Sequence, residues 1–252
     1  MPPVRGVTLL PEGSMTDPKL PAPARSPIAV PWSATDAVHG IGLFTVGGIL
    51  TVLVLGRFRG ASGAADEAMT TLAIAVLTGL LLAAVWLFAI RRHDAQWRSL
   101  GLGRPAVGSD FVLAIPCLTL SIGFFGVYVA LVDAFGPDLL VPEPIDADNL
   151  GSSVFRVVNV AVVGLIGPFA EEVFFRGFLL TAFVPSLGVF RAAALASAVF
   201  AISHIALGVA VPFFVTGLLL SWLYVKTRSI WPPLLAHMAQ NVLAIIGMFA
   251  TA

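Results

Sequence analysis

Residues 157–184 read VVNVAVVGLIGPFAEEVFFRGFLLTAFV, an apolar run that is interrupted by two glutamates, one arginine and one proline. A helix that crosses the hydrocarbon core of a bilayer needs ~20 apolar residues, because lipid offers no partner to an unpaired backbone amide. The run is long enough to span a membrane, and Pro168 predicts a kink or break within it. Glu171, Glu172 and Arg176 are costly inside a bilayer, so each of them needs a physical reason.

The composition of the whole chain agrees with a membrane protein. Of its 252 residues, 58% are hydrophobic and 11% are charged, and the mean hydropathy is +0.96. A soluble domain carries roughly 25% charged residues, so this chain has too little polar side chain to cover a water-facing surface. Its net charge of zero removes the electrostatic case for binding nucleic acid. A soluble enzyme, a disordered chain and a nucleic-acid-binding module are therefore disfavoured.

Seven apolar runs predict an all-α fold, a polytopic transmembrane helical bundle of about seven spans. The runs cover residues 37–56, 68–90, 111–132, 157–184, 191–209, 211–225 and 230–250. Residues 1–36 contain eight prolines among small and polar residues, which predicts an extended or disordered tail. The expected organisation is a Pro-rich disordered cytoplasmic tail (1–36) followed by a transmembrane helical domain (37–252).

Lysine and arginine predict the orientation of the bundle, because cytoplasmic loops carry an excess of both. The loop at 91–110 carries four arginines, whereas the loop at 133–153 carries no basic residue and five acidic ones. We therefore expect the N-terminus in the cytoplasm and the C-terminus outside. Short loops and the absence of an N-glycosylation sequon fit a bacterial inner membrane.

Ionisable residues gather in the C-terminal half, beginning with the pattern E-E-x-x-x-R at 171–176. Glu172 and Arg176 are four residues apart on one helical face, so they can neutralise each other as a buried ion pair. Glu171 is turned ~100° away and is not the natural partner of this arginine. A structural ion pair therefore accounts for two of the three charges and leaves Glu171 available as a proton acceptor.

Two further patterns are F-x-x-x-H at 200–204 and H-x-x-x-N at 237–241. Phe200 lies one turn before His204 and can hold its imidazole in a fixed orientation, although a lone histidine in an apolar helix is commonly a core residue. His237 and Asn241 point into one sector, which suits an interhelical hydrogen-bond pair or two donors aimed at one oxygen. At 1.5 Å per residue, Glu171 and His204 lie ~20 Å and His237 ~12 Å from the cytoplasmic ends. These depths favour one polar cavity within the bundle.

The sequence lacks the residue patterns that several intramembrane chemistries need. No aspartate follows Asp148, so a two-aspartate site cannot be built in the C-terminal half. The H-E-x-x-H helix of zinc proteases and the G-x-S-x-G elbow of serine hydrolases are also absent. A carboxylate with two imidazoles and an amide suits the attack of water on a carbonyl, for which a base, an orienting group and oxyanion donors are needed.

The three patterns, in this order, resemble the CPBP family, which comprises the CAAX proteases and bacteriocin-processing enzymes and is also called the Abi family. Type II CAAX prenyl endopeptidases belong to it, and the resemblance covers residues 150–252. It implies an intramembrane glutamic endopeptidase in which Glu171 activates a water with the help of His204. His237 and Asn241 would stabilise the oxyanion, and no cofactor is implied. The supporting residues would be Glu172, Arg176 and Phe200.

Two alternatives stay open. One glutamate and two histidines could also bind a zinc ion, although the spacing of His237 and Asn241 favours two hydrogen-bond donors over metal ligands. The same buried groups could instead form an ion pathway in a transporter or bind an anchored partner, as in bacteriocin immunity, but no inverted repeat supports transport. The expected partners are the lipid bilayer and a membrane-associated peptide or protein substrate. The sequence does not specify whether that substrate is prenylated.

Overall fold

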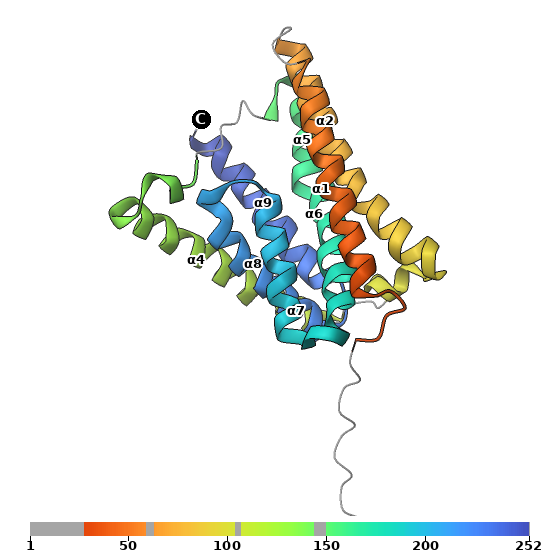
Figure 1. The fold of residues 1–252 in the computed structure, drawn as a ribbon. Coiled ribbons are helices and arrows are strands. Elements are labelled where there is room, and N and C mark those ends of the chain that lie inside the picture. Colours follow the sequence, from red (N-terminus) through yellow and green to blue (C-terminus); the bar gives the residue numbers. More distant parts are fainter. Residues whose placement is uncertain (1–27, 59–62, 104–106, 144–149, 252) are drawn as a thin grey trace, which may run out of the picture.

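The structure is a computed structural model that describes residues 28–58, 63–103, 107–143 and 150–251. Within these ranges the chain forms helices and short connections, and it contains no strand. In chain order the elements are α1 (Ala34–Gly56), α2 (Gly63–Val85), η1 (Trp86–Arg91), η2 (Trp97–Leu100), α3 (Gly108–Val112), α4 (Ala114–Phe135), η3 (Asp138–Leu140), α5 (Ser153–Ala161), η5 (Val162–Ile166), α6 (Gly167–Glu171), η6 (Glu172–Leu180), α7 (Thr181–Ser203), α8 (Leu207–Thr227) and α9 (Trp231–Thr251) (Figure 1).

Six helical stretches in the described residues are long and apolar enough to cross a membrane, so the chain is an integral membrane protein. One of them, Val154–Ser203, has 50 residues and would extend about 75 Å, more than twice the ~30 Å hydrocarbon core. Its backbone leaves the helical region at Gly188 (φ 74°, ψ 165°), and the chain turns back there (Figure 1). This stretch contains the predicted run 157–184 and most of the run 191–209, which extends six residues past the end of the helix at Ser203 and into α8. The expectation of about seven spans is confirmed in outline.

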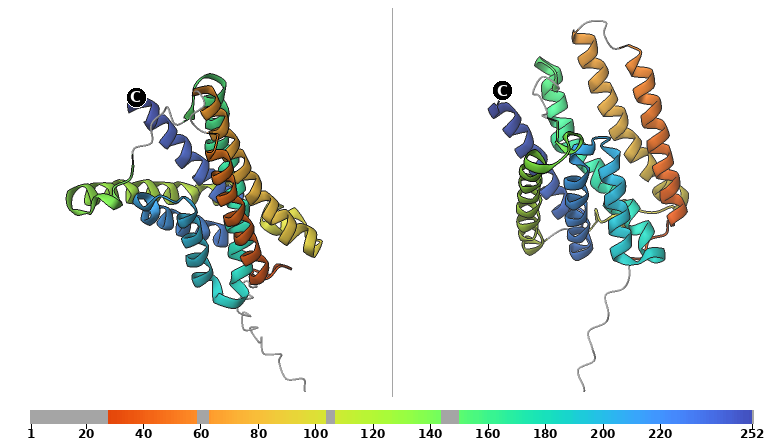
Figure 2. Two further views of the ribbon diagram at one scale, coloured as in Figure 1. Left: turned by 45° about the horizontal axis from the view of Figure 1, so that its top comes forward. Right: turned by 60° about the vertical axis from the view of Figure 1, so that its left-hand side comes forward.

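The bundle has a pair of helices at one edge and the motif-bearing helices next to it. Figure 2 shows α1 and α2 side by side at one edge of the bundle and α4 at the opposite edge. The core between them is centred on η6, where Phe174, Phe175 and Phe178 are buried and pack their rings against one another. Because these large apolar side chains bury η6 in the core, the two charged residues of η6, Glu172 and Arg176, are also buried.

The disturbance predicted at Pro168 is a widened turn rather than a break. Proline has no N–H, and its ring crowds the carbonyl four residues earlier. The preceding residues Val162–Ile166 are π-helical, and the N–H of Gly167 bonds to the oxygen of Val162, five residues back. In this register the oxygen of Val163 would pair with residue 168, which is a proline. The Val163 carbonyl therefore lacks a donor from its own helix.

The predicted tail, residues 1–36, falls mostly outside the described residues, and its boundary lies earlier than predicted. Trp32 is 2% exposed, and its Nε1 donates to the oxygen of Phe178 and to Oγ1 of Thr181, both at 3.1 Å. Ser33 then caps α1, which begins at Ala34. The proline-rich composition does not indicate this packed segment, in which Trp32 and Ile28 are the buried side chains.

Candidate active site

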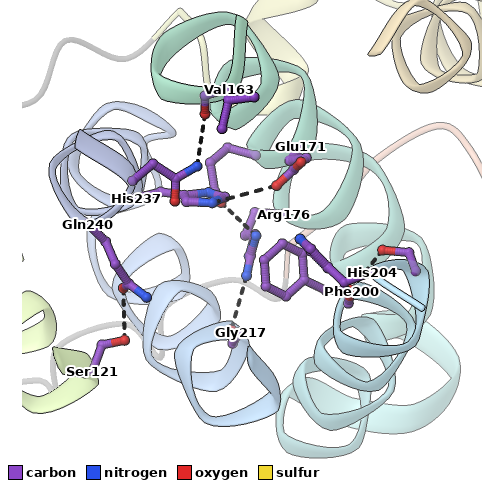
Figure 3. Close-up of polar contacts among 12 residues, drawn as sticks. Ser121, Val163, Glu171, Arg176, Phe200, His204, Gly217, His237 and Gln240 are labelled. Atoms are coloured by element: carbon purple, nitrogen blue, oxygen red, sulfur yellow. Dashed lines mark hydrogen bonds and ion pairs between the residues drawn. The ribbon is translucent and has the colours of Figure 1, made fainter. Parts of the chain in front are cut away.

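The three motifs lie on helical stretches that face a common interior, as Figure 3 shows. They come from α6 and η6, from the end of α7 and from α9, in that order: Glu171, Glu172 and Arg176; Phe200 and His204; His237 and Asn241. Residues up to 70 positions apart therefore meet in one part of the bundle. This convergence is the arrangement that the common depth of the three patterns predicted.

The predicted pair of Glu172 and Arg176 is present. Nη1 of Arg176 donates to Oε1 of Glu172 at 2.6 Å, and neither side chain has any exposed surface. Nη2 of Arg176 reaches the backbone oxygen of Gly217 in α8 at 3.4 Å. The guanidinium carbon also lies 4.7 Å from the centre of the Phe200 ring, within the range of a cation–π interaction. Arg176 thus joins η6 to both α7 and α8.

His237 contacts both neighbouring glutamates. Its Nδ1 lies 2.8 Å from Oε1 of Glu172, and its Nε2 lies 3.5 Å from Oε2 of Glu171. Because a carboxylate accepts, Nδ1 carries the hydrogen of the bond to Glu172, and Nε2 is the nitrogen that faces Glu171. The sequence did not indicate this second role of Glu172, since the two residues are far apart in the chain.

The two glutamates differ in access to their carboxylates. Oε1 of Glu172 accepts from both Arg176 and His237, and its Oε2 is enclosed without a hydrogen-bond partner in the described part of the chain. The side chain of Glu171 is 23% exposed, so a water or a peptide can reach its carboxylate. One carboxylate is therefore enclosed and bound to two partners, and the adjacent one is accessible.

His204 is held by Phe200, as the pattern predicted. Its Nδ1 lies 2.8 Å from the backbone oxygen of Phe200, which can only accept, so Nδ1 carries the hydrogen and Nε2 remains open. The imidazole also packs edge-on between the rings of Phe200 and Phe213, with centroids 4.8 and 4.5 Å away. Figure 3 shows the side chain directed toward the interior that Glu171 faces. No hydrogen bond joins His204 to Glu171 among the described residues.

Asn241 and His237 do not share one partner in this structure. Nδ2 of Asn241 donates to the oxygen of Val163 at 2.9 Å, the same carbonyl that Pro168 leaves without a helical donor. The expected pairing of Asn241 with His237 on one oxygen is therefore not what the side chains do here, although the amide keeps a second N–H. Pro168, five residues after Val163, is the sequence signal that could have revealed this bond.

The arrangement of the acidic and imidazole groups bears on metal binding. Among the residues that the structure describes, no group of three or more histidine, cysteine, aspartate and glutamate side chains is placed to hold a metal ion. His237 turns both nitrogens toward glutamates, while His204 uses one nitrogen on a backbone carbonyl.

An apolar groove of about 530 Å³ lies on the helices that carry the candidate site, and none of its lining residues is a specified position of the three motifs. Side chains of α3, η5, α6 and α9 line it, among them Phe111, Phe169 and Met238. Phe169 lies two residues before Glu171, and Met238 directly follows His237. An apolar segment in this groove would therefore lie against the helices that carry the candidate site.

Comparisons with known proteins relate the part of the chain that carries the three motifs to membrane peptidases. Residues 153–243, which contain all three motifs, match the family described as type II CAAX prenyl endopeptidase Rce1-like. Over 87 residues the chain is 30% identical to a protein of Bacillus subtilis (strain 168) named "Putative membrane peptidase YdiL". No solved structure matches the chain.

These matches cover only part of each protein. The aligned segment covers 34% of this chain and 36% of the Bacillus protein, about a third of each. Over this segment the resemblance to the CAAX-protease (CPBP) family is confirmed. The first three spans lie outside residues 153–243, which the family matches.

Proposed function

We propose that the protein is an intramembrane endopeptidase, similar to the CAAX proteases, in which Glu171 activates a water for attack on a peptide bond. The observation that carries the proposal is the contrast between the two neighbouring glutamates. Glu172 is enclosed and holds Arg176 and His237, whereas Glu171 is accessible and lies 3.5 Å from Nε2 of the same histidine. A reactive carboxylate beside a rigid support is the arrangement that general base catalysis needs.

In the proposed reaction, the oxygen of water forms a bond to the carbonyl carbon while Glu171 takes the proton. The carbonyl electrons move onto oxygen, and the negative charge needs donors that are already in place. Collapse of this intermediate breaks the C–N bond, and Glu171 returns its proton to the leaving amine. His204 supports the first step, because its open Nε2 can accept from the attacking water.

His237 and Asn241 are the proposed stabilisers of the oxyanion. When His237 is charged, Nε2 donates while Nδ1 remains bound to Glu172, so the ring can serve the intermediate without moving. Asn241 has one N–H on Val163 and one N–H left to donate. We propose that these groups work without a metal or another cofactor.

The proposed substrate is a membrane-associated peptide or protein, and the proposed location is a bacterial inner membrane with the N-terminus in the cytoplasm. The apolar groove on α6 and α9, the helices that also carry Glu171 and His237, supports a substrate with an apolar segment. The family name supports a CAAX-type peptide as the first substrate to test.

The proposal is tested by comparing membrane-associated peptides from cells that carry the wild-type protein, Glu171→Gln or Glu143→Gln. Glu143 is an exposed glutamate outside the site and provides a matched control for the same chemical change. We expect a set of cleavage products that is present with wild type and Glu143→Gln and lost with Glu171→Gln. Identical products in all three strains would contradict the proposal.

A further inference from the structure

We infer that Gln240, an unspecified position within the pattern H-x-x-x-N, supplies an amide donor to the oxyanion at the proposed active site. The inference rests on the proposed function. It begins from a difference between the two adjacent amides of α9, because the nitrogen of Asn241 is bound to Val163 whereas the nitrogen of Gln240 is open.

Two hydroxyl groups fix the orientation of the Gln240 amide. Oγ of Ser121 lies 2.8 Å from Oε1 of Gln240 and 2.6 Å from Oγ1 of Thr216. A carbonyl oxygen only accepts, so Ser121 donates to Gln240, and Thr216 must then donate to Ser121, which has a single hydroxyl hydrogen. The chain of bonds runs from α8 through α4 to α9. It holds Oε1 of Gln240 toward α4 and turns Nε2 away from it (Figure 3).

The open nitrogen of Gln240 is unusual for a polar group inside this bundle. It has no hydrogen-bond partner among the described residues, yet it is not one of the enclosed side-chain atoms. The side chain itself is half-buried. The bond from Ser121 accounts for the oxygen of this amide but not for its nitrogen, and a donor that is oriented, unpaired and accessible is available to a ligand.

The position of Gln240 on α9 places it beside the motif residues. At 100° per residue, Gln240 is turned about 60° to one side of His237, and Asn241 about 40° to the other. The three side chains thus share one face, with the histidine between the two amides. Ser121 is 4% exposed and Thr216 is 4% exposed, so the support beneath Gln240 is buried and rigid.

The chemical role follows from the reaction proposed above. When the water oxygen bonds to the carbonyl carbon and its proton moves to Glu171, the charge that develops on the carbonyl oxygen is met by Nε2–H of Gln240 and by His237. A donor fixed before the reaction stabilises this charge without reorganising. In this scheme Gln240 touches the reacting atoms, and Ser121 and Thr216 are positioning residues.

The test measures kcat and KM for purified Gln240→Glu and Ser121→Ala in lipid vesicles. The probe is an internally quenched peptide made from the most abundant precursor that the wild-type strain cleaves. Gln240→Glu keeps the oxygen that Ser121 binds and removes the donor, and we expect kcat to fall about 10²- to 10³-fold with KM nearly unchanged. Ser121→Ala should lower kcat less, and Ser121→Thr, which keeps the hydroxyl, should restore it. Gln96→Glu, the same change on an exposed loop residue, should have the wild-type kcat.

The outcomes separate this inference from the proposed function. Wild-type kcat in Gln240→Glu, or a higher KM with an unchanged kcat, would overturn the role of Gln240 even if Glu171→Gln is inactive. Equal cleavage by wild type and Glu171→Gln would instead overturn the proposed function. If Gln240→Glu does not fold, the comparison of Ser121→Ala with Ser121→Thr decides, and equal kcat values for these two would reject the inference.

Discussion

The imidazole of His237 donates from Nδ1 to Oε1 of Glu172 at 2.8 Å, although the two residues lie 65 positions apart. The same oxygen accepts from Nη1 of Arg176 at 2.6 Å. A single carboxylate oxygen therefore connects α9 to η6 and fixes which nitrogen of the histidine faces Glu171. The two consecutive glutamates therefore have different environments, since Glu172 is enclosed between Arg176 and His237 and Glu171 is accessible.

Glu172→Gln should destabilise the protein strongly. The change leaves the buried charge of Arg176 without a counter-ion, and breaking a buried ion pair costs about 3–5 kcal/mol. Thermal unfolding in detergent should show a clearly lower Tm than for wild type. Glu171→Gln is the matched control and should keep the wild-type Tm, because Glu171 is accessible and bears no such pair. Equal Tm values for the two variants would contradict the division of roles.

The bond between Asn241 and Val163 should depend on Pro168. In the wild type, Asn241→Leu leaves the Val163 carbonyl without a donor, at a cost of about 1–3 kcal/mol in unfolding free energy. Pro168→Ala restores a backbone N–H at the position that a π-helical register assigns to this carbonyl. The cost of Asn241→Leu should therefore be smaller in the Pro168→Ala background.

A double-mutant cycle measures this dependence directly. It compares the free energy of unfolding of wild type, the two single variants and the double variant in one detergent. If the changes in unfolding free energy caused by Asn241→Leu and Pro168→Ala are strictly additive, the bond between Asn241 and Val163 does not depend on Pro168.

Gly217→Ala should push α7 and α8 apart. A Cβ atom at this position would lie 2.8 Å from Cβ of Ser197 and 3.1 Å from its Cα, which cannot rotate away. Overpacking of this kind costs about 1–3 kcal/mol, and the displaced carbonyl of Gly217 would also lose Nη2 of Arg176. Gly123→Ala is the control, because a Cβ atom at residue 123 would have no described neighbour within 4 Å. A Tm for Gly217→Ala equal to that of Gly123→Ala would contradict this prediction.

Metal chelation should leave cleavage unchanged. The proposed reaction uses the carboxylate of Glu171 and hydrogen-bond donors, so prolonged treatment with EDTA or phenanthroline removes nothing that it needs. The measurement is the cleavage rate before and after treatment, with zinc added back in a parallel sample. Loss of activity that zinc restores would replace the glutamate-base mechanism with a zinc site.

Much of the fold follows from the sequence because hydrophobic length is a local property. The apolar runs located the helices within a few residues, and the i, i+4 spacing located the ion pair of Glu172 and Arg176. The turn at Gly188 and the π-helical residues before Pro168 were only partly foreseen, since both depend on how the helix adjusts to a residue that interrupts it. The sequence marks the position of such a disturbance and not its form.

The types of the polar residues and their depth within the helices predict which residues form the candidate site. They do not predict the hydrogen bonds among those residues. Nothing local indicates that His237 binds Glu172 or that Asn241 binds a backbone oxygen, because each bond joins separate helices. The sequence does not single out Gln240 for the same reason, since its environment is set by Ser121 and Thr216 on two other helices.

The most direct measurement of the central claim is the cleavage rate of purified Glu171→Gln in lipid vesicles, compared with wild type at equal amounts of folded protein. Loss of a general base should lower kcat about 10²- to 10⁴-fold while the Tm stays at the wild-type value. A folded Glu171→Gln protein that cleaves the same peptide at the wild-type rate would contradict the account.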